Sequence, residues 1–412
     1  MSFPPTIDAA LARLAAVRPA HYQRSRNSLD GAVSRLSPYV THGFVTLPQI
    51  LASVLAANGL SVQHKFVYEL GWREYFRHVW KARGEEIFSA LHAGVLPDTC
   101  YAAQVPPDVR EARCGVPAID AAVRTLYATG YLHNHARMWL ASYLVHLRKV
   151  SWRPAADWLY THLLDGDLAS NHLSWQWVAG TGSHKPYLFN AENVARYAPP
   201  DWHSSGTVID TTYAVLDALA RSPDAAPAQN ADVAAMTSAL ARRAGLVEPA
   251  ALAVPPAAAN LVLPDAARIV GRDVWLVHPW ALREPPSTTP PDAASPHAAP
   301  PGTLALGVSF AEFHRRWPWS AARWNFVSAR MNTLTTMSWF GDVQTIARAL
   351  AQARSVTSVA DPHVDMDALP GVNWRPPAAL FAPVERPCSS FSQWWSRVTL
   401  GLEDAVELPG LR

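Results

Sequence analysis

Residues 165–177 read Asp165-Gly-Asp-Leu-Ala-Ser-Asn171-His-Leu-Ser-Trp175-Gln-Trp177, and this stretch decides the fold. It holds two carboxylates, one amide and two indoles. Carboxylates are rarely buried unless they are paired or hydrogen-bonded, and an indole is a large apolar surface with one polar handle. The combination predicts a pocket for a large aromatic molecule with polar edges.

A second stretch upstream supplies complementary side chains. It reads Gly130-Tyr-Leu-His-Asn134-His-Ala-Arg137-Met138 and offers an amide, a cation and a soft apolar side chain. We expect these to face the same pocket. His133 and His135 are two positions apart and do not share a helix face, so we predict no metal site there.

Composition bounds the class of protein. The chain has 412 residues, enough for two or three domains. Hydrophobic residues make up 49% and charged residues 17%, which permits a substantial core. The formal net charge of +2 gives no strong overall attraction to nucleic acid, although a local basic groove remains open.

The cysteine pattern bounds the compartment. Cys100, Cys114 and Cys388 form neither a CxxC pair nor a disulfide framework, which favours a reducing, cytoplasmic setting. We see no signal peptide and no apolar run long enough to span a membrane, so we expect no membrane association.

Residues 1–221 show helical spacing of apolar residues in four places, namely 48–55, 67–81, 118–127 and 135–147. Asp165-Gly-Asp is typical of a turn that leads into a new helix, capped by Asp167 or Ser170. This region therefore predicts an all-helical domain.

The composition changes twice after that domain. Residues 222–265 are rich in Ala and Pro and predict a linker, interrupted by one helix around 232–243. Residues 266–412 contain apolar runs at 273–278, 303–308 and 355–360, a Pro-rich loop at 285–301, and helical patterns at 321–334 and 343–353. Alternating strands and helices predict a smaller, Rossmann-like α/β domain with a parallel sheet.

Four blocks of the helical region resemble the photolyase/cryptochrome flavoproteins, in the order found in that family. They are Val33 to Tyr39, Glu69 to Glu74, Tyr131 to Met138, and Asp165 to Trp177. The resemblance is to the FAD-binding helical domain and implies FAD as the cofactor. The three cysteines argue against the four-cysteine iron–sulfur cluster of one family branch.

The α/β region more weakly resembles a reduced form of the family's antenna domain, in Val274 to Leu282 and Trp319 to Phe326. The domain order would then be reversed. The alternative is a small α/β module that packs on the flavin domain and binds nothing. No GxGxxG motif supports a dinucleotide site, and the antenna chromophore, if any, stays unassigned. We expect this module to be dispensable for flavin binding.

The resemblance implies a set of cofactor-binding residues. These are Tyr22, Val33, Ser34, Arg35, Leu36, Ser37, Arg73, Asn134, Arg137, Asp165, Asp167 and Asn171. Arg137 and Asp165 resemble the ion pair beside the isoalloxazine ring, and Asn171 the residue that faces flavin N5. Taken alone, Arg137 and Asp165 also fit a salt bridge that links helices.

The resemblance further implies photoreduction and catalysis. The implied catalytic residues are Trp175, Trp152, Asn171 and Glu69. Trp175 and Trp152 resemble the first two members of the electron-transfer chain. No tryptophan matches the third member, for which Tyr101 is a candidate, while Trp139 and Trp158 offer other routes. Any single tryptophan here also fits a core role.

The implied substrate pocket receives a flipped cyclobutane pyrimidine dimer. Its residues are Glu69, Trp72, Asn134, Met138 and Trp177, with the two indoles as stacking walls. Asn134 and Met138 stand where the (6-4) branch usually has histidine, which argues against (6-4) repair. The segment after Asn190 departs from the family, which weakens the expected DNA contacts.

We therefore predict a blue-light-dependent FAD flavoprotein. The leading hypothesis is a monomeric deoxyribodipyrimidine photolyase, a carbon–carbon lyase that repairs damaged DNA by electron transfer from reduced FAD. One alternative is a cryptochrome-like photoreceptor that signals through a protein partner without repair. Another is a flavin-binding protein with no role in light.

Overall fold

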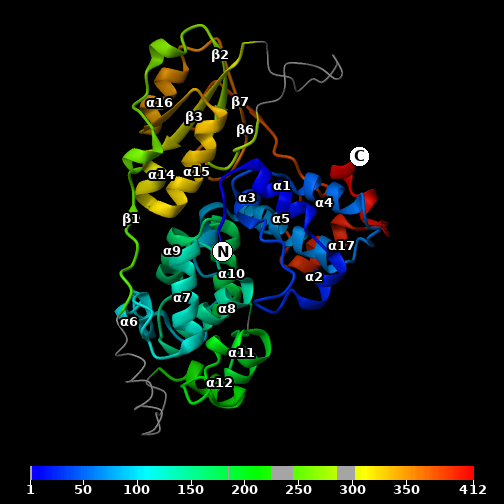
Figure 1. Cartoon of the computed structure of the whole chain (residues 1–412), viewed down its shortest axis with the longest axis vertical. Helices are drawn as coiled ribbons and strands as arrows, with labels where there is room; N and C mark the ends of the chain where they lie inside the picture. Colours follow the sequence, from blue (N-terminus) through cyan, green and yellow to red (C-terminus); the bar gives the residue numbers. More distant parts are fainter. Residues whose placement is uncertain (1, 184, 224–244, 285–301) are drawn as a thin grey trace.

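The computed structural model describes residues 2–183, 185–223, 245–284 and 302–412. Within these ranges the chain forms a helical part and an α/β part that lie end to end (Figure 1). The predicted architecture, a mainly helical domain followed by a smaller α/β domain, is confirmed.

The helical part agrees with the predicted elements. The helices at 48–55, 67–81 and 118–127 are present, and the one at 135–147 continues through a π-helical turn, η3 (Tyr143–Leu147). No described helix is both long and apolar enough to cross a bilayer. The helices are α1 (Ile7–Ala15), α2 (Pro19–Ser25), α3 (Ser37–Thr41), α4 (Leu47–Leu55), α5 (Lys65–Arg83), α6 (Pro107–Arg110), α7 (Pro117–Thr129), α8 (Asn134–Ser142), α9 (Trp152–His162), α10 (Leu168–Ala179), α11 (Ala191–Tyr197) and α12 (Tyr213–Arg221).

The helix α10 is central to this part and packs against α5, α8 and α9. It begins where the sequence predicts, because the Asp167 carboxylate accepts a hydrogen bond from the Ser170 N–H at 2.8 Å and caps the helix. It ends at Gly180, whose left-handed backbone (φ 83°) suits glycine. The predicted turn and cap are therefore confirmed.

The α/β part is built on a five-stranded parallel sheet in the order β5-β3-β2-β6-β7. The central strand β2 is buried along its whole length, and Val274 pairs with Leu304 on one side and Val356 on the other. The strands are β2 (Asp273–Val277), β3 (Leu304–Phe310), β5 (Met337–Gly341), β6 (Ser355–Val359) and β7 (Val372–Arg375), and the helices are α14 (Ala311–Arg316), α15 (Ala321–Leu334) and α16 (Val343–Leu350).

The three predicted strands are confirmed as β2, β3 and β6, whereas β5 and β7 are additional. The sequence did not indicate them, because β5 reads Met-Ser-Trp-Phe-Gly and has no β-branched residue, and β7 has only Val372. Their pairing with β3 and β6, rather than local propensity, makes them strands.

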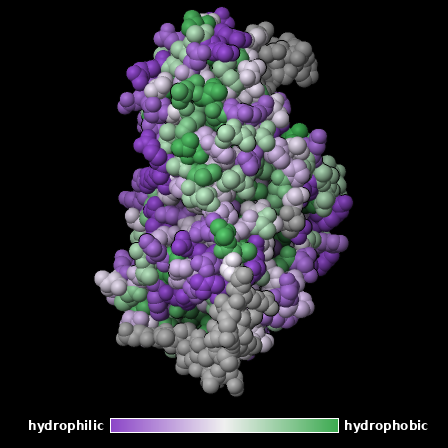
Figure 2. Space-filling model, turned by 60° about the vertical axis from the view of Figure 1, so that its left-hand side comes forward, coloured by the Kyte–Doolittle hydropathy of each residue, from purple (hydrophilic) through white to green (hydrophobic). Residues whose placement is uncertain are grey.

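Apart from residues 222 and 223, only the second half of the predicted linker, residues 245–265, lies within the described residues. The helix expected at 232–243 lies outside the described residues, as does the Pro-rich loop at 285–301. The described part, 245–265, runs along the side of the molecule that faces forward in Figure 2, where Val254 and Leu263 are exposed apolar residues.

This described part of the predicted linker is not a loose connection, because it contacts both the helical part and the α/β part. Glu248 forms an ion pair with Arg110 at 3.0 Å and accepts a hydrogen bond from Trp158 Nε1 at 2.9 Å. The short strand β1 (Ala251–Leu252) pairs with β4 (Trp319–Ser320). Composition could not reveal this, because an Ala/Pro-rich segment still has backbone groups that can pair and one half-buried carboxylate, Glu248, anchors it.

The C-terminal segment corrects the predicted domain 266–412. The sheet ends at Arg375, and the chain then returns to the helical part, where α17 (Phe391–Val398) packs on α5 (Figure 1). The Glu74 carboxylate of α5 accepts the N–H groups of Leu380 and Phe381 at 2.6 and 3.2 Å. Residues 380–412 therefore cover the helical part rather than extend the α/β part.

Candidate functional site

A cavity of about 260 Å³ lies in the helical part, between α8, α10 and the turn before α10. Its walls mix apolar side chains such as Phe76 and Leu159 with charged ones, as is typical of ligand pockets. The predicted site residues that line it are Ser37, Arg73, Asn134, Arg137, Met138, Asp165, Asp167, Asn171 and Trp175.

Arg137 and Asp165 form the predicted ion pair. The Arg137 Nη2 atom donates to both carboxylate oxygens, at 2.9 and 2.7 Å, and Nε donates to the Leu132 carbonyl at 2.9 Å. Burial favours the neutral carboxyl, but Arg137 outweighs this effect and lowers the pKa of Asp165. The pair links α8 to the turn and also presents two fixed charges to the cavity.

Asp167 also lines the cavity, but its carboxylate is already engaged. One oxygen caps α10 through Ser170, and the other lies 2.6 Å from Nη2 of Arg77 on α5. Burial opposes ionisation, but Arg77 and then His363 hold the pKa of Asp167 well below its usual range. Its expected place beside the flavin ring or ribityl chain stays a prediction.

Asn171 and Trp175 lie one turn apart on α10 and so share a helix face. The Asn171 amide donates to the Ala156 carbonyl of α9 at 2.9 Å, which fixes its orientation. Trp175 is only 3% exposed. The two side chains therefore line the cavity as rigid groups, as a redox cofactor site requires.

Two guanidinium groups, of Arg35 in the loop before α3 and of Arg73 on α5, suit the diphosphate of FAD. Arg35 has a left-handed backbone (φ 52°), and its buried Nε finds no hydrogen-bond partner among the described residues. Arg73 donates to Thr41 Oγ1 at 3.1 Å, and burial lowers its pKa. Such guanidinium groups bind phosphate well, and Ser37 and Arg73 both line the cavity.

The remaining predicted cofactor residues support this loop rather than line the cavity. Leu36 is buried, while Val33 and Ser34 are half-buried. Tyr22 packs edge-on against Phe66 with ring centroids 5.4 Å apart, and burial raises the pKa of its phenol. The cofactor roles of all these residues stay predictions.

The predicted substrate residues are not brought together. Trp72 stacks on Phe391 of α17, with ring centroids 4.0 Å apart and planes at 11°, so one indole face is covered. Trp177 is 45% exposed and tilts against Tyr187 instead. Neither indole lines the cavity. The expectation of two open stacking walls is therefore corrected, because a distant segment packs on one of them.

Glu69 likewise lies outside the cavity lining. It forms an ion pair with Arg26 at 3.5 Å, and burial raises its pKa. Asn134 and Met138 do line the cavity, and the Asn134 amide contacts the Met138 sulfur at 3.4 Å. The cavity thus contains two of the five predicted substrate residues.

The predicted electron-transfer residues belong to one hydrophobic cluster of the helical part. Trp152 begins α9, and its ring lies 6.5 Å from that of His172 on α10. The segment after Tyr101 runs beside this helix start, since the Ser151 N–H donates to the Ala102 carbonyl at 2.9 Å. Tyr101 is half-buried and stays the predicted surface donor.

The other two candidate tryptophans, Trp139 and Trp158, pack in or against the core of the helical part and form hydrogen bonds there. Trp139 is fully buried and donates to Asn193 at 3.0 Å, and Trp158 donates to Glu248. These bonds satisfy the indole N–H groups, as expected for packing residues.

Four further residues of this site were not predicted: Arg77, Arg323, Asp361 and His363. Arg77 could have been predicted from the sequence, because it follows Arg73 by one helical turn on the same face of α5. The sequence indicated Asp361 and His363 more weakly. They come directly after a predicted parallel strand, at the carboxyl edge of the sheet, where ligand sites are often found. Nothing in the sequence indicated Arg323.

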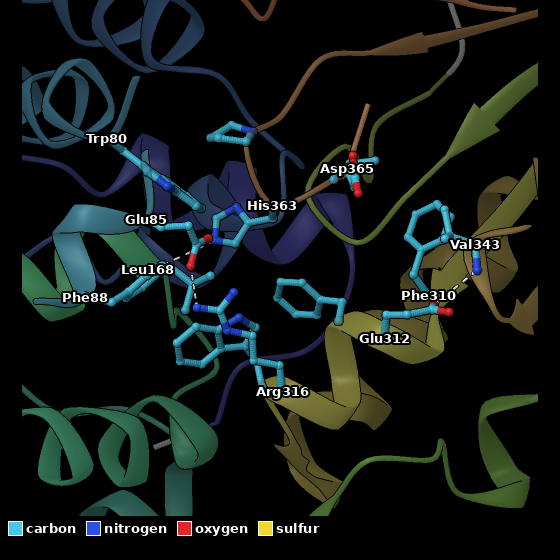
Figure 3. Close-up of a pocket in the computed structure, with 14 residues that line it drawn as sticks. Trp80, Glu85, Phe88, Leu168, Phe310, Glu312, Arg316, Val343, His363 and Asp365 are labelled. Atoms are coloured by element: carbon cyan, nitrogen blue, oxygen red, sulfur yellow. Dashed lines mark hydrogen bonds and ion pairs between the residues drawn. The ribbon is translucent and has the colours of Figure 1, made fainter. Parts of the chain in front are cut away.

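A second cavity, of about 390 Å³, lies between the two parts (Figure 3). Trp80 and Phe88 come from the helical part, and Trp317 and His363 from the α/β part. In Figure 3 His363 points toward Leu168, whose N–H donates to His363 Nε2 at 3.3 Å. The loop after β6 is therefore in contact with the first residue of α10.

Comparisons with known proteins show which proteins the helical part is similar to. Residues 66–222 match the family model described as the FAD binding domain of DNA photolyase. A deoxyribodipyrimidine photo-lyase of Streptomyces griseus is 36% identical over 168 residues, which cover 40% of this chain and 36% of that protein. A cryptochrome DASH of Idiomarina loihiensis is 31% identical, covering 44% of this chain and 42% of that protein.

A third relative, a photo-lyase of Thermus thermophilus, is 36% identical and is covered over 46% of its length. The matches thus span less than half of each relative's length. The solved cryptochrome structure of Synechocystis aligns with 58% of this chain and 56% of its own, at 23% identity and a TM-score of 0.44. The family model and the curated relatives show that the helical part of this chain is similar to the FAD-binding domain of the photolyase/cryptochrome family.

Proposed function

We propose that this protein is a blue-light-dependent flavoprotein of the cyclobutane pyrimidine dimer photolyase type. FAD would supply the light-driven electron chemistry, and the protein would bind and orient the cofactor and substrate. We also propose that residues 266–375 form the family's antenna-like α/β domain, here placed after the flavin domain.

One observation carries the proposal. The Arg137–Asp165 pair, Asn171 and Trp175 line the same cavity as Asn134 and Met138. The first set suits a flavin and its electron donor, and the second suits the polar edge and apolar bulk of a flipped pyrimidine dimer. Their common wall would bring cofactor and lesion within reach of each other.

Individual roles follow from this arrangement. Arg137 would hold negative charge at the ring, with Asp165 fixing the cation. Asn171 would both donate and accept a hydrogen bond. Trp175 would deliver electrons, supplied through Trp152 and Tyr101. The exposed Lys185 and Arg196 are the candidates for DNA phosphate contacts.

The test is direct repair. Full-length protein reduced under anaerobic conditions is mixed with an oligonucleotide that contains one cyclobutane thymine dimer and is illuminated with blue light. We expect the dimer to revert to thymines in light and not in darkness. Protein that holds reduced FAD but leaves the dimer intact would refute the repair function.

A cryptochrome-like photoreceptor is the second candidate, and the stacking of Phe391 on Trp72 favours it. With that face covered, the indole is not free to stack on a lesion while α17 stays docked. Binding assays separate the two functions: a photolyase binds dimer-containing DNA more tightly than intact DNA, and a photoreceptor without repair binds both equally. A flavoprotein without a light role would fail to photoreduce at all.

A further inference from the structure

The α/β part contributes a fully buried arginine to the flavin-side turn. Arg323, on α15, donates through Nη2 to the Gly166 carbonyl at 2.5 Å and through Nη1 to the Tyr160 carbonyl at 3.3 Å. Its guanidinium also lies over the Tyr160 ring, 4.6 Å from the centroid. Gly166 is the middle residue of the turn whose two aspartates line the flavin cavity.

The close approach of this arginine explains why the turn has glycine. A Cβ atom on residue 166 would lie 2.5 Å from Nη1 of Arg323 and 3.1 Å from the Tyr160 ring. A side chain there would force the Arg323 guanidinium to move. Residue 166 is therefore matched to an arginine from the other part of the chain.

A second connection reaches the same turn from the loop after β6. Arg77 lies between two carboxylates, 2.6 Å from Asp167 and 3.0 Å from Asp361. Asp361 in turn contacts His363 Nδ1 at 2.6 Å, and His363 accepts the Leu168 N–H (Figure 3). These contacts close a ring that joins the loop to the beginning of α10.

The ring is charged and largely buried, although a quarter of the Arg77 side chain is exposed, so its members depend on one another. Burial opposes ionisation of Asp361, but Arg77 and His363 hold the pKa of that carboxyl well below its usual range. His363 is also stacked on Trp280, with centroids 4.5 Å apart and planes at 6°. Removing one charge from such a ring leaves another unpaired in a dry environment.

From these contacts we propose that Arg323 and Asp361 are positioning residues of the flavin site, which make the α/β part an integral half of that site. They act through the 165–167 turn: Arg323 holds its middle carbonyl, and Asp361 orients the arginine that pairs with Asp167. The proposal concerns FAD binding and redox poise, so it is independent of whether the protein repairs DNA.

The two residues carry opposite charges, which gives the proposal a signature beyond stability. A positive charge near the ring favours flavin reduction, and a negative charge opposes it. Asp361→Asn removes a negative charge, so it should raise the midpoint potential of the bound FAD. Arg323→Met removes a positive charge, so it should lower that potential.

The experiment measures flavin retention after gel filtration and the midpoint potential of the full-length holoprotein for each variant. We expect both variants to bind FAD roughly tenfold or more weakly, with potential shifts of opposite sign. Arg323→Lys keeps the charge and loses the two-pronged contact. It should weaken FAD binding without lowering the potential. If Arg323→Met does not fold, Arg323→Lys alone tests the role of Arg323.

The matched control is Asp273→Asn, which breaks the Asp273–Arg354 pair at the far end of β2. It removes an Asp–Arg contact from the same sheet without touching the turn, and it should change neither flavin retention nor potential. Unchanged retention and potential in Arg323→Lys and Asp361→Asn would overturn the proposal. Potential shifts of the same sign in Asp361→Asn and Arg323→Met would also overturn it, because general loosening would then explain them.

Discussion

The predicted flavin side and the predicted substrate side of the site are built in different ways. The flavin side consists of α8, α10 and the turn between α9 and α10, which are neighbours in the sequence, and its predicted ion pair and helix cap are formed. On the substrate side Trp72 lies under Phe391, which comes from near the other end of the chain.

The difference shows what a local motif determines. Asp165 meets Arg137 because each is fixed on a short helix or cap whose geometry follows from nearby residues. Whether the face of Trp72 is open depends instead on a segment that packs there only in the complete fold. A motif therefore predicts the identity of a side chain, but not what covers it.

The largest effect is expected on the flavin side, from Asp165→Ala. This change leaves Arg137 facing the cavity without its counter-charge, and breaking a buried pair in this way costs about 3–5 kcal/mol. The purified protein should lose most of its FAD, measured by the flavin absorbance per polypeptide.

The control for this variant is Asp217→Ala on α12, where Asp217 forms an exposed pair with Arg221. Exposed pairs contribute little, so flavin content should not change. If Asp165→Ala protein kept its full complement of flavin, the cavity would not be the flavin site.

The next largest effect concerns the cover on the substrate side. Phe391→Ala removes the ring that stacks on Trp72, at a cost of about 3–5 kcal/mol in stability. If α17 alone blocks lesion binding, this variant should bind dimer-containing DNA more tightly than the wild type does, and acrylamide should quench its tryptophan fluorescence more strongly.

Phe381→Ala is the matched control. Phe381 is as buried as Phe391 and lies in the same segment, but it contacts Trp394 and Trp395 instead of Trp72. It should lose similar stability without a gain in lesion binding. Equal gains in both variants would mean that loosening of the segment, not exposure of Trp72, is responsible.

The same contrast limits what the sequence could predict for the whole molecule. Helices with clear apolar periodicity and strands rich in valine were predictable, because local physics is sufficient for them. The return of residues 380–412 was not, since the anchoring carboxylate of Glu74 lies on an ordinary helical stretch. Arg323 was equally hidden, because its partners are two carbonyl groups, and a carbonyl has no sequence signature.

A smaller effect is expected from Trp175→Phe. The ring is buried and lines the cavity, so phenylalanine should fit with little loss of flavin. Phenylalanine is harder to oxidise, so blue-light reduction of the flavin in the presence of a thiol should be much slower. Trp139→Phe, which alters a fully buried indole outside the cavity lining, should keep the wild-type rate. The reverse pattern would move the electron route to Trp139.

The smallest effect separates the two sides by pH. Burial raises the pKa of Glu74 to about 7, although the Leu380 and Phe381 N–H groups oppose this. The folded state then holds a proton that the unfolded state has lost, so stability falls as pH rises from the usual glutamate range towards 7. The lowered pKa of Asp165 has the opposite sense, and its contribution changes only in more acidic solution.

Between about pH 5 and pH 8 the C-terminal cover should therefore loosen while flavin binding stays constant. Hydrogen exchange of residues 380–398 and flavin absorbance, followed together, measure the two sides. Glu74→Gln should remove the pH dependence of exchange, and a wild-type segment equally protected across that range would contradict the assignment of Glu74 as its anchor.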